Sequence, residues 1–426
     1  MNILLIGAGG REHCFAWKLN QSPLCDKLFT APGNTGTATC GTNLDIAITD
    51  FPGLAAAALE YGIDLILVGP EEPLVKGIRE FFEQEEDTRH IKIIGPGQEA
   101  AQLEGSKAYA KDFMKRHGVP TAAYREFTAA SFEEGIQYLK QHTLPVVLKA
   151  DGLAAGKGVL ICNTLAEAIA EFELMLMQEK FGTAGDKVVV EEFLRGIEMS
   201  IFVLTDGKHY VLLPEAKDYK RIGEGDSGLN TGGMGAVSPV PVMTETLKAK
   251  IVSSIIDPTI RGLQKDHLDY IGFIFIGLMI NGEEPFVIEY NCRMGDPETE
   301  VVIPRLKNDL VELLDAAANR SLNNILAETD ERSAVAIVAV SGGYPGEYKK
   351  GAVIHGLHDH DIPGSLLFHA GTGIKEKDIV TTGGRVLVAV SFGENIGEAA
   401  DRSDHLLQEV SFNKMFYRKD IGYEFR

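Results

Sequence analysis

The sequence predicts a multidomain protein of the α/β and α+β classes. Its 426 residues exceed what one hydrophobic core normally organises, so about two to four domains are expected. Strand and helix patterns alternate over the first hundred residues, which is typical of a doubly wound parallel sheet. A hydrophobic content of 45% and a charged content of 24% are typical of globular domains and leave no room for a long disordered tail.

The N-terminal unit is expected to carry parallel strands whose carboxyl ends meet at one edge. A turn signal ends each strand, and ligands bind at that edge in such folds. Helices are expected from Arg11 and over 51–61. Strands are expected over 2–6, 27–30, 64–68 and 91–94. The turns that follow them are expected at Gly7, 31–33, 69–70 and 95–97.

A mixed α+β body follows, and a third unit begins near Ser333. The third unit contains two apolar strand runs, AVAIVAV and GGRVLVAVSFG. No low-complexity linker separates the units, so they are expected to pack together. The body is expected to contain helices at 107–117, 165–178 and 244–265, and strands at 146–149, 187–192, 200–204, 210–213, 272–280 and 286–293.

Charge and cysteine content exclude several classes of function. The formal net charge of −20 opposes binding to nucleic acid or to an anionic membrane. The most apolar stretch, 270–280, is much shorter than the roughly 20 residues that a membrane span needs, and the N-terminus reads as a strand rather than a signal peptide. The five cysteines are scattered without a CxxC pair, so neither a disulfide framework nor a zinc site is predicted. We expect a cytoplasmic protein with small-molecule partners.

The segment 286–300, FVIEYNCRMGDPETE, carries the strongest functional signal. Side chains alternate along a strand, which places Glu289, Asn291 and Arg293 on one face. A carboxylate and an amide oxygen can hold Mg²⁺ whose other ligands are water and phosphate, and an arginine suits an oxyanion. The alternative is a strand end with solvated charges. The opposite face would bury Ile288, Tyr290 and Cys292, which makes a nucleophilic cysteine the weaker interpretation.

Two glycine-rich turns could hold phosphate. The turn at 7–12, GAGGRE, begins like a dinucleotide fingerprint but has Glu12 at the third glycine position, so a single phosphate beside Arg11 or a tight structural turn are the remaining readings. The loop 149–158, KADGLAAGKG, lacks the spacing of a P-loop but is rich in glycine and lysine. It is either a phosphate-covering flap or a plain surface loop, and Lys149 on an apolar strand end favours an anion.

Two further segments add weaker signals. The strand end 188–194 offers backbone groups that can match an adenine edge, and Glu198 follows it. The glycine cluster at 230–235, NTGGMG, is either a site of close backbone approach or a structural turn.

These motifs together resemble the phosphoribosylamine-glycine ligase (glycinamide ribonucleotide synthetase) family of the ATP-grasp superfamily. The resemblance rests on GAGGREH, APGNTGTA, VGPEEPLV, LEGSKAYAKDF, KADGLAAGKGV, EEFLRG, NTGGMGAVSP, EYNCRMGDPETE, SGGYPG and GGRVL, in this order from Met1 to about Tyr423. It implies an ATP-grasp fold with a Rossmann-like (pre-ATP-grasp) domain at 1–103, an ATP-grasp domain at 104–330 whose flap subdomain covers about 121–195, and a mixed α/β C-terminal domain at 331–426.

The resemblance also implies a reaction. Glycine and 5-phosphoribosylamine would be joined with ATP, through glycyl phosphate, to give glycinamide ribonucleotide, ADP and phosphate in purine synthesis. Two Mg²⁺ or Mn²⁺ ions would assist, and the protein would be a monomer or a dimer.

The family's motif positions imply a set of site residues in this chain. The catalytic ones would be Arg293, Asp296 and Lys149, and the metal ligands Glu289 and Asn291. Substrate would contact Gly9, Gly10, Arg11, Asp218, Lys220, Arg293, Asp296 and Glu298. The nucleotide and its metal would contact Lys107, Lys149, Gly156, Lys157, Gly158, Glu191, Glu192, Phe193, Leu194, Glu198, Met279, Glu289 and Asn291.

The chain departs from the family's pattern at Lys217, Tyr219 and Glu300, where a glutamine, a histidine and a glutamine are expected. Substrate contacts near residue 218 are therefore less secure. Two other classes compete with the ligase. A nicotinamide dehydrogenase is disfavoured by Glu12, and a non-catalytic ATP-binding protein is disfavoured because Glu289, Asn291 and Arg293 are all present.

Overall fold

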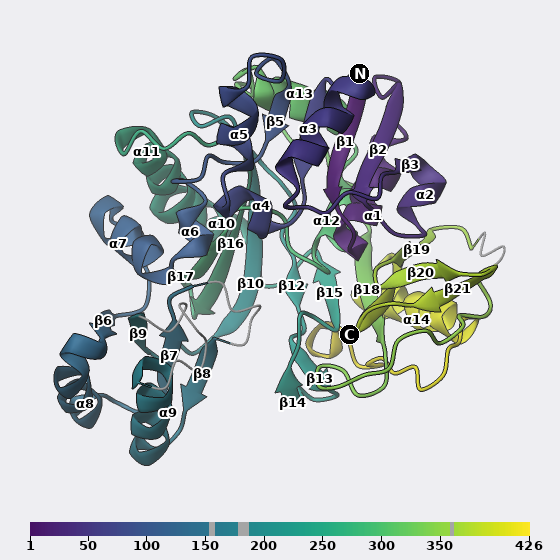
Figure 1. The fold of residues 1–426 in the computed structure, drawn as a ribbon. Helices are drawn as coiled ribbons and strands as arrows, with labels where there is room; N and C mark the ends of the chain where they lie inside the picture. The colour runs from purple at the N-terminus through teal and green to yellow at the C-terminus, as the bar shows by residue number, and fades with distance from the viewer. Residues whose placement is uncertain (153–157, 178–186, 358–361) are drawn as a thin grey trace.

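The computed structural model describes residues 1–152, 158–177, 187–357 and 362–426. Its N-terminal unit, central body and C-terminal unit pack together, while a small sheet with two helices lies apart from the N-terminal unit at the lower left of Figure 1. No helix within these ranges is both long enough and apolar enough to cross a bilayer.

A five-stranded parallel sheet forms the N-terminal unit, as the sequence predicts. The strand order is β3-β2-β1-β4-β5, so the order reverses between β1 and β4 and leaves a switch point at the carboxyl edge. The strands are β1 (Asn2–Gly7), β2 (Lys27–Pro32), β3 (Thr42–Asn43), β4 (Leu65–Val68) and β5 (Lys92–Ile94). The helices are α1 (Gly10–Leu19), α2 (Thr37–Cys40), α3 (Phe51–Glu60), α4 (Glu71–Val75) and α5 (Ile78–Gln84).

The central body is built on an antiparallel sheet of order β11-β10-β16-β17. Its strands are β10 (Ile197–Thr205), β11 (Tyr210–Leu212), β16 (Gly272–Asn281) and β17 (Glu284–Asn291). Short α6 (Gln102–Gly105) leads into α7 (Lys107–His117), which has the bounds predicted from the sequence. Ser106 caps α7 by accepting a hydrogen bond from the amide of Tyr109.

The single helix expected over 244–265 is divided into α10 (Glu245–Ile251), a π-helical turn (Val252–Ile256) and α11 (Asp257–Lys265). Pro258 stands at the start of α11. Proline has no amide hydrogen to donate to the preceding turn, so the α-helical hydrogen-bond ladder cannot run through this position. The predicted helix is confirmed as one helical segment over 245–265, with a π-helical turn inside it.

A small subdomain with its own core follows α7. Its sheet has the antiparallel order β6-β9-β7-β8, and α8 and α9 pack on it through Phe127, Leu148 and Phe172. Its elements are β6 (Tyr124–Thr128), a 3₁₀ turn (Ala129–Ser131), α8 (Phe132–Gln141), β7 (Val146–Ala150), β8 (Val159–Cys162), α9 (Leu165–Met177) and β9 (Lys187–Glu192).

The C-terminal sheet has the order β12-β15-β18-β22-β19 and takes strands from both sides of residue 330. The strands are β12 (Lys217–Asp218), β15 (Gly235–Ser238), β18 (Ser333–Val340), β19 (Ser365–His369) and β22 (Arg385–Gly393), and α14 (Ile396–Gln408) packs on them. Two hairpins and a final 3₁₀ turn complete this region, namely β13 (Arg221–Gly223) with β14 (Ser227–Asn230), β20 (Thr372–Lys375) with β21 (Asp378–Thr381), and Tyr423–Phe425. The domain boundaries drawn from the sequence stay predictions.

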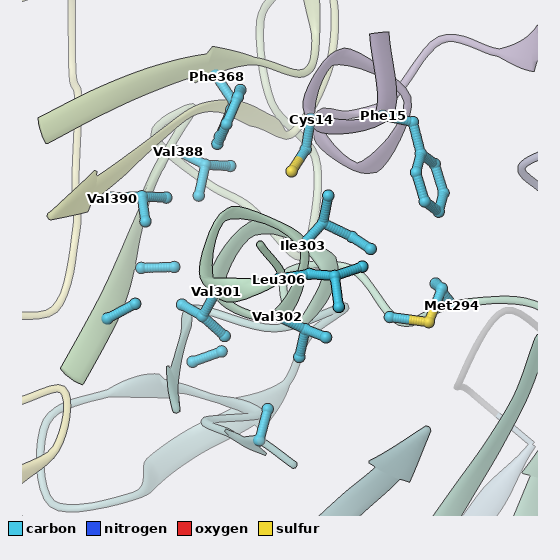
Figure 2. Packing of buried hydrophobic residues seen from close by; sticks show 14 of the residues in the cluster. Cys14, Phe15, Met294, Val301, Val302, Ile303, Leu306, Phe368, Val388 and Val390 are labelled. Carbon is cyan, nitrogen blue, oxygen red and sulfur yellow. The ribbon is translucent and has the colours of Figure 1, made fainter. Parts of the chain in front are cut away.

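Helix α12 (Thr299–Arg305) lies at the centre of the molecule, before α13 (Leu310–Ala318). Figure 2 shows its apolar side chains facing Cys14 of α1 on one side and Val388 and Val390 of β22 on another. Val301, Val302 and Ile303 are fully buried. Helix α12 therefore joins all three units of the protein, and it begins directly after the segment that the sequence predicts to be functional.

A buried histidine, His13, and a half-buried one, His369, join the N-terminal unit to the C-terminal unit. The amide of His369 donates a 2.8 Å hydrogen bond to Nδ1 of His13, and the two rings lie 5.7 Å apart. Burial, with a contribution from His369, lowers the pKa of His13 to about 3, and burial lowers the pKa of His369 to about 4. Both rings are neutral at neutral pH.

We predict that acidification destabilises the protein through this pair. The unfolded chain protonates both histidines near pH 6.5 whereas the folded one does not, so each contributes up to ~1.4 kcal/mol of lost stability per pH unit below that value. Urea unfolding between pH 7 and pH 4.5 should give a shallower pH dependence for His13→Gln than for the wild type. The exposed His405→Gln serves as the control. Equal slopes for wild type and His13→Gln would contradict this assignment.

Candidate active site

A cavity of about 470 Å³ lies where the three units meet. Arg11 and Glu71 reach it from the carboxyl edge of the N-terminal sheet, Lys107 from α7, Glu289 from β17 and Arg385 from β22. The predicted site residues on its lining are Arg11, Lys107, Lys149, Gly158, Glu191, Asp218, Lys220, Glu289, Asn291, Arg293, Asp296 and Glu298. Residues that the sequence places far apart thus share one space.

Strand β17 presents its polar side chains to the cavity, with one departure from strict alternation. The register shifts between Gly277 and Leu278 of β16, so one residue of β17, Ile288, is bulged out of the pairing. Ile288 consequently lies on the cavity lining beside Glu289, and its predicted burial with Tyr290 is wrong. Tyr290 and Cys292 are buried as expected.

Cys292 is not arranged as a nucleophile. Its amide donates a 2.8 Å hydrogen bond to Oε2 of Glu104, and its thiol contacts the same oxygen. Burial and the charge of Glu104 raise the pKa of the thiol well above its ordinary value. The thiol stays protonated, as its expected burial implies.

Glu289 and Asn291 are suited to a divalent cation that also binds phosphate. The side chain of Glu289 lines the cavity without a hydrogen bond or ion pair to any residue that the structure describes, and Oδ1 of Asn291 accepts one long bond of 3.4 Å, from Arg293. Within the described ranges no group of three acidic, histidine or cysteine side chains could hold a metal by itself. Two protein oxygens leave most of an octahedral shell to water and phosphate, which is how proteins commonly bind nucleotide-associated Mg²⁺.

Two lysines face Glu289 and form the cationic part of the cavity. Nζ of Lys107 donates a 3.0 Å bond to the carbonyl of Gly152, and Nζ of Lys149 donates a 3.2 Å bond to the carbonyl of Ile288. Burial and the neighbouring Lys149 lower the pKa of Lys107, while Glu289 opposes this shift. Cations that destabilise each other in this way favour an anion between them. Gly156 and Lys157, predicted in the same loop, lie outside the described residues.

Lys111 completes this region and was not among the predicted site residues. It lies one helical turn after Lys107 on α7, so both side chains share a face, and Lys111 forms a buried ion pair with Glu191. The spacing of four residues in the motif SKAYAK was the signal that could have identified it.

Arg293 is held between two carboxylates. Its Nε lies 3.2 Å from Oε2 of Glu71, and its Nη2 lies 2.8 Å from Oε1 of Glu104. Burial alone would lower the pKa of Arg293, but Glu104 and Glu71 raise it. Burial likewise opposes the ionisation of Glu71, yet Arg293 and Arg11 lower its pKa overall. Neither glutamate was predicted from the sequence, although Glu71 follows a strand end at the ligand-binding edge.

The N-terminus of α1 is already occupied by carboxylates of the chain itself. Oε2 of Glu12 accepts a 2.6 Å bond from the amide of Gly9, and Oδ2 of Asp296 accepts a 3.4 Å bond from the amide of Arg11. A Cβ on Gly7 would lie 2.5 Å from the Glu12 side chain, which therefore fills the switch point between β1 and β4. A dinucleotide pyrophosphate has no room there. Contacts of Gly9, Gly10 and Arg11 with a substrate stay predictions.

A second charged group surrounds Lys220. Its Nζ lies 2.7 Å from Glu198 and 3.2 Å from Asp218, and these carboxylates raise its pKa well above the ordinary value. Burial and the charge of Asp218 raise the pKa of Glu298 to about 8, although Lys220 opposes this shift. Arg385 forms a 3.0 Å ion pair with Asp296 and ties this group to β22.

Lys217 and Tyr219, which depart from the family's pattern beside Asp218, contact the C-terminal segment instead of the cavity. Nζ of Lys217 lies 3.9 Å from the centre of the Tyr219 ring and 2.8 Å from Glu424. The hydroxyl of Tyr219 donates a 2.5 Å bond to the same Glu424. The two departures therefore form one contact with the C-terminal segment and do not line the cavity.

The side chains of the remaining predicted nucleotide-binding residues do not line the cavity. The carboxylate of Glu192 accepts a 2.8 Å bond from the amide of Ala123, and Met279 lies buried in β16. Phe193 stacks beneath Arg195. The described lining of the cavity does not include Glu192, Phe193, Leu194, Glu198 or Met279. Backbone groups of 191–194 can still meet a base, so these assignments stay predictions.

The fold and the site together define an ATP-grasp enzyme. An antiparallel sheet presents a carboxylate and an amide to a cavity whose lysines come from α7 and from a small antiparallel subdomain. The biotin carboxylase domain of the 2-oxoglutarate carboxylase of Hydrogenobacter thermophilus has the same fold, with a TM-score of 0.75 at 18% identity over 97% of this chain and 91% of that one.

Sequence comparison identifies the family within this class. Profiles of the phosphoribosylglycinamide synthetase N domain, ATP-grasp (A) domain and C domain match residues 1–104, 105–299 and 334–424. Phosphoribosylamine-glycine ligases of Vibrio cholerae and Escherichia coli K12 are each 47% identical, covering 99% of this chain and 98% of theirs. The crystal structure of this ligase from Thermotoga maritima gives a TM-score of 0.86 at 34% identity, covering 99% of this chain and 100% of that one. The chain belongs to the phosphoribosylglycinamide synthetase family.

Glu300, the third departure, is a buried carboxyl group beneath the site. Both of its oxygens are buried without a hydrogen-bond partner in the described structure, and a Cβ on Gly10 would lie 2.5 Å from Oε1. Burial and the charge of Asp296 raise its pKa well above the ordinary value, while Arg385 opposes this shift. Burial without a hydrogen-bond partner therefore favours the protonated form of Glu300, and this neutral form has nearly the shape of the glutamine expected there.

We predict that Glu300→Gln stabilises the protein at alkaline pH. The unfolded chain releases the proton above about pH 4.5 and the folded one retains it, so stability falls as pH rises toward the folded pKa. Denaturant unfolding at pH 8 should show a higher free energy of unfolding for Glu300→Gln than for wild type, and the difference should shrink toward pH 4. The exposed Glu86→Gln is the control. A difference that does not vary with pH would refute the assignment.

Proposed function

We propose that this chain joins glycine to 5-phosphoribosylamine with ATP, giving glycinamide ribonucleotide, ADP and phosphate in purine synthesis. Family membership supports the reaction. The observation that carries the assignment of the site is that one cavity holds an anion-binding pair, Lys107 and Lys149, together with Glu289, Asn291 and Arg293. In this proposal the two lysines bind phosphate, Glu289 and Asn291 bind metal, and Arg293 binds the carboxylate substrate.

The chemistry requires activation of a carboxylate. A carboxylate is a poor electrophile, so ATP first phosphorylates it, and the amine then displaces phosphate from the acyl phosphate. Phosphoryl transfer depends mainly on positioning and on neutralising charge. Lys107 and Lys149 hold the ATP phosphates in this proposal, while Glu289 and Asn291 hold two Mg²⁺ or Mn²⁺ ions. The bound ions supply neutralisation of the phosphate charge.

Arg293 orients the glycine carboxylate in this proposal. Its planar guanidinium can form two parallel hydrogen bonds to a carboxylate, which lysine cannot match. In the structure two separate carboxylates face Arg293, Glu71 at 3.2 Å from Nε and Glu104 at 2.8 Å from Nη2, which supports an affinity of this guanidinium for carboxylates. Glycine would replace one of them. Burial raises the pKa of Glu104, which makes this carboxylate the more readily neutralised of the two.

The other assignments follow the family's pattern. Asp218, Lys220, Asp296 and Glu298 contact phosphoribosylamine, together with Gly9, Gly10 and Arg11. The backbone of 191–194 contacts adenine, Glu198 contacts ribose, and Gly156 to Gly158 cover the phosphates with Lys157. Met279 packs against the base. The protein acts in the cytoplasm as a monomer or a dimer, with small molecules as its partners.

A substrate-dependence assay tests the reaction. We expect steady ADP release from ATP only when glycine and phosphoribosylamine are both present, because with glycine alone each enzyme forms at most one acyl phosphate and one ADP before the missing amine stops the reaction. ADP would be measured with each substrate alone and with both. Steady ADP formation that needs neither substrate would overturn the proposed ligase activity.

Replacing Arg293 tests the assignment of the carboxylate site. We predict that Arg293→Ala binds ATP as the wild type does but loses at least ~100-fold in kcat/KM for glycine, because a charge-assisted bidentate pair is removed. ATP affinity would be measured by calorimetry and turnover by ADP release. Arg261→Ala, at an exposed position of α11, is the matched control. Near-normal turnover of Arg293→Ala would refute the role.

A further inference from the structure

A buried charge triad connects the central body to the small subdomain. Oε2 of Glu191, on β9, lies 3.1 Å from Nζ of Lys111 and 3.0 Å from Nζ of Lys149. The three side chains are only 2%, 4% and 7% exposed for Lys111, Glu191 and Lys149. The other oxygen of Glu191 is buried without a hydrogen-bond partner among the described residues. One carboxylate thus serves two ammonium groups.

Each lysine of the triad is also fixed by another contact. Nζ of Lys111 donates a 2.7 Å hydrogen bond to the hydroxyl of Thr121, which donates a 2.6 Å bond to the carbonyl of Val287 on β17. Lys149 donates to the carbonyl of Ile288, the next residue of the same strand. Lys111 and Lys149 are therefore tied to neighbouring residues of β17, and both line the cavity.

The net charge of the triad determines how strongly it attracts the phosphates of a bound nucleotide. Two ammonium groups and one carboxylate leave one positive charge. Without Lys111, the single charge of Lys149 would be balanced by Glu191, and no net positive charge would remain for a phosphate. Charges are weakly screened in a buried cluster, so this difference is large there. Burial, with a contribution from Lys149, lowers the pKa of Lys111 to about 8, so Lys111 still carries its charge at pH 7.

We propose that Lys111 is a positioning residue that neutralises Glu191, so that the charge of Lys149 stays available to the phosphates of the nucleotide. This inference rests on the proposed function for nucleotide binding at this cavity. It assigns Lys111 a role in binding the triphosphate and none in binding the base. A residue that merely stabilised the fold would affect every ligand of the cavity equally.

The experiment compares a phosphorylated ligand with an uncharged one. In Lys111→Met, which keeps the length of the side chain and removes its charge, we expect the Kd for ATP at constant Mg²⁺ to rise about tenfold. The inhibition constant of adenosine should change less than about twofold, and kcat at saturating ATP should stay near wild type because the lost interaction is uniform. Lys115→Met, exposed on the same helix, should match the wild type.

A second substitution separates charge from structure. Adding Glu191→Gln to Lys111→Met restores one net positive charge, so the ratio of the ATP and adenosine constants should return toward the wild-type ratio. Equal weakening of both ligands by Lys111→Met, or no recovery of the ratio in the double variant, would overturn the proposal. Substrate-dependent ADP release by the wild type is measured alongside, so a failure of the ligase reaction is recognised separately.

Discussion

The burial of helix α12 fixes the geometry on which the rest of the site depends. Val301, Val302 and Ile303 are fully enclosed by α1, the C-terminal sheet and the central body, and each such side chain contributes ~1.5–3 kcal/mol when removed from water. The helix begins at Thr299, directly after the loop that carries Arg293, Asp296 and Glu298. Because α12 packs against α1 and against β15, β18 and β22, this packing fixes the end of the loop between the N-terminal unit and the C-terminal sheet.

The fold reduces the repulsion among the acidic side chains in and directly after this loop, Asp296, Glu298 and Glu300, in two ways. Arg385 forms a 3.0 Å ion pair with Asp296. For Glu298 and Glu300, burial and neighbouring carboxylates raise the pKa and so favour the uncharged form. Arg385 lies on β22, far from the loop in the sequence, and supplies part of the positive charge beside these acids.

The cavity is consequently divided by charge. Lysines from α7 and β7 face Glu289, whereas the loop before α12 presents acids and arginines. This separation suits a reaction in two steps. The first step transfers a phosphoryl group and requires the phosphate charge to be neutralised, and the second step binds an amine. The carboxylates at the start of α1 belong to the second part, since Glu12 and Asp296 occupy the amides that would otherwise attract an anion.

The sequence by itself determined the parallel N-terminal sheet, the bounds of α7 and the shared face of Glu289, Asn291 and Arg293, because strand alternation and helical periodicity are local properties. The ten motifs in order also identified the family correctly. Only the tertiary structure revealed the bulge at Ile288, the pairing of Arg293 with Glu71 and Glu104, and the use of Lys111. These features depend on contacts between residues far apart in the chain, and on burial that changes the charge a side chain can carry. Neither the contacts between distant residues nor the burial of a side chain can be read from a local pattern of residues.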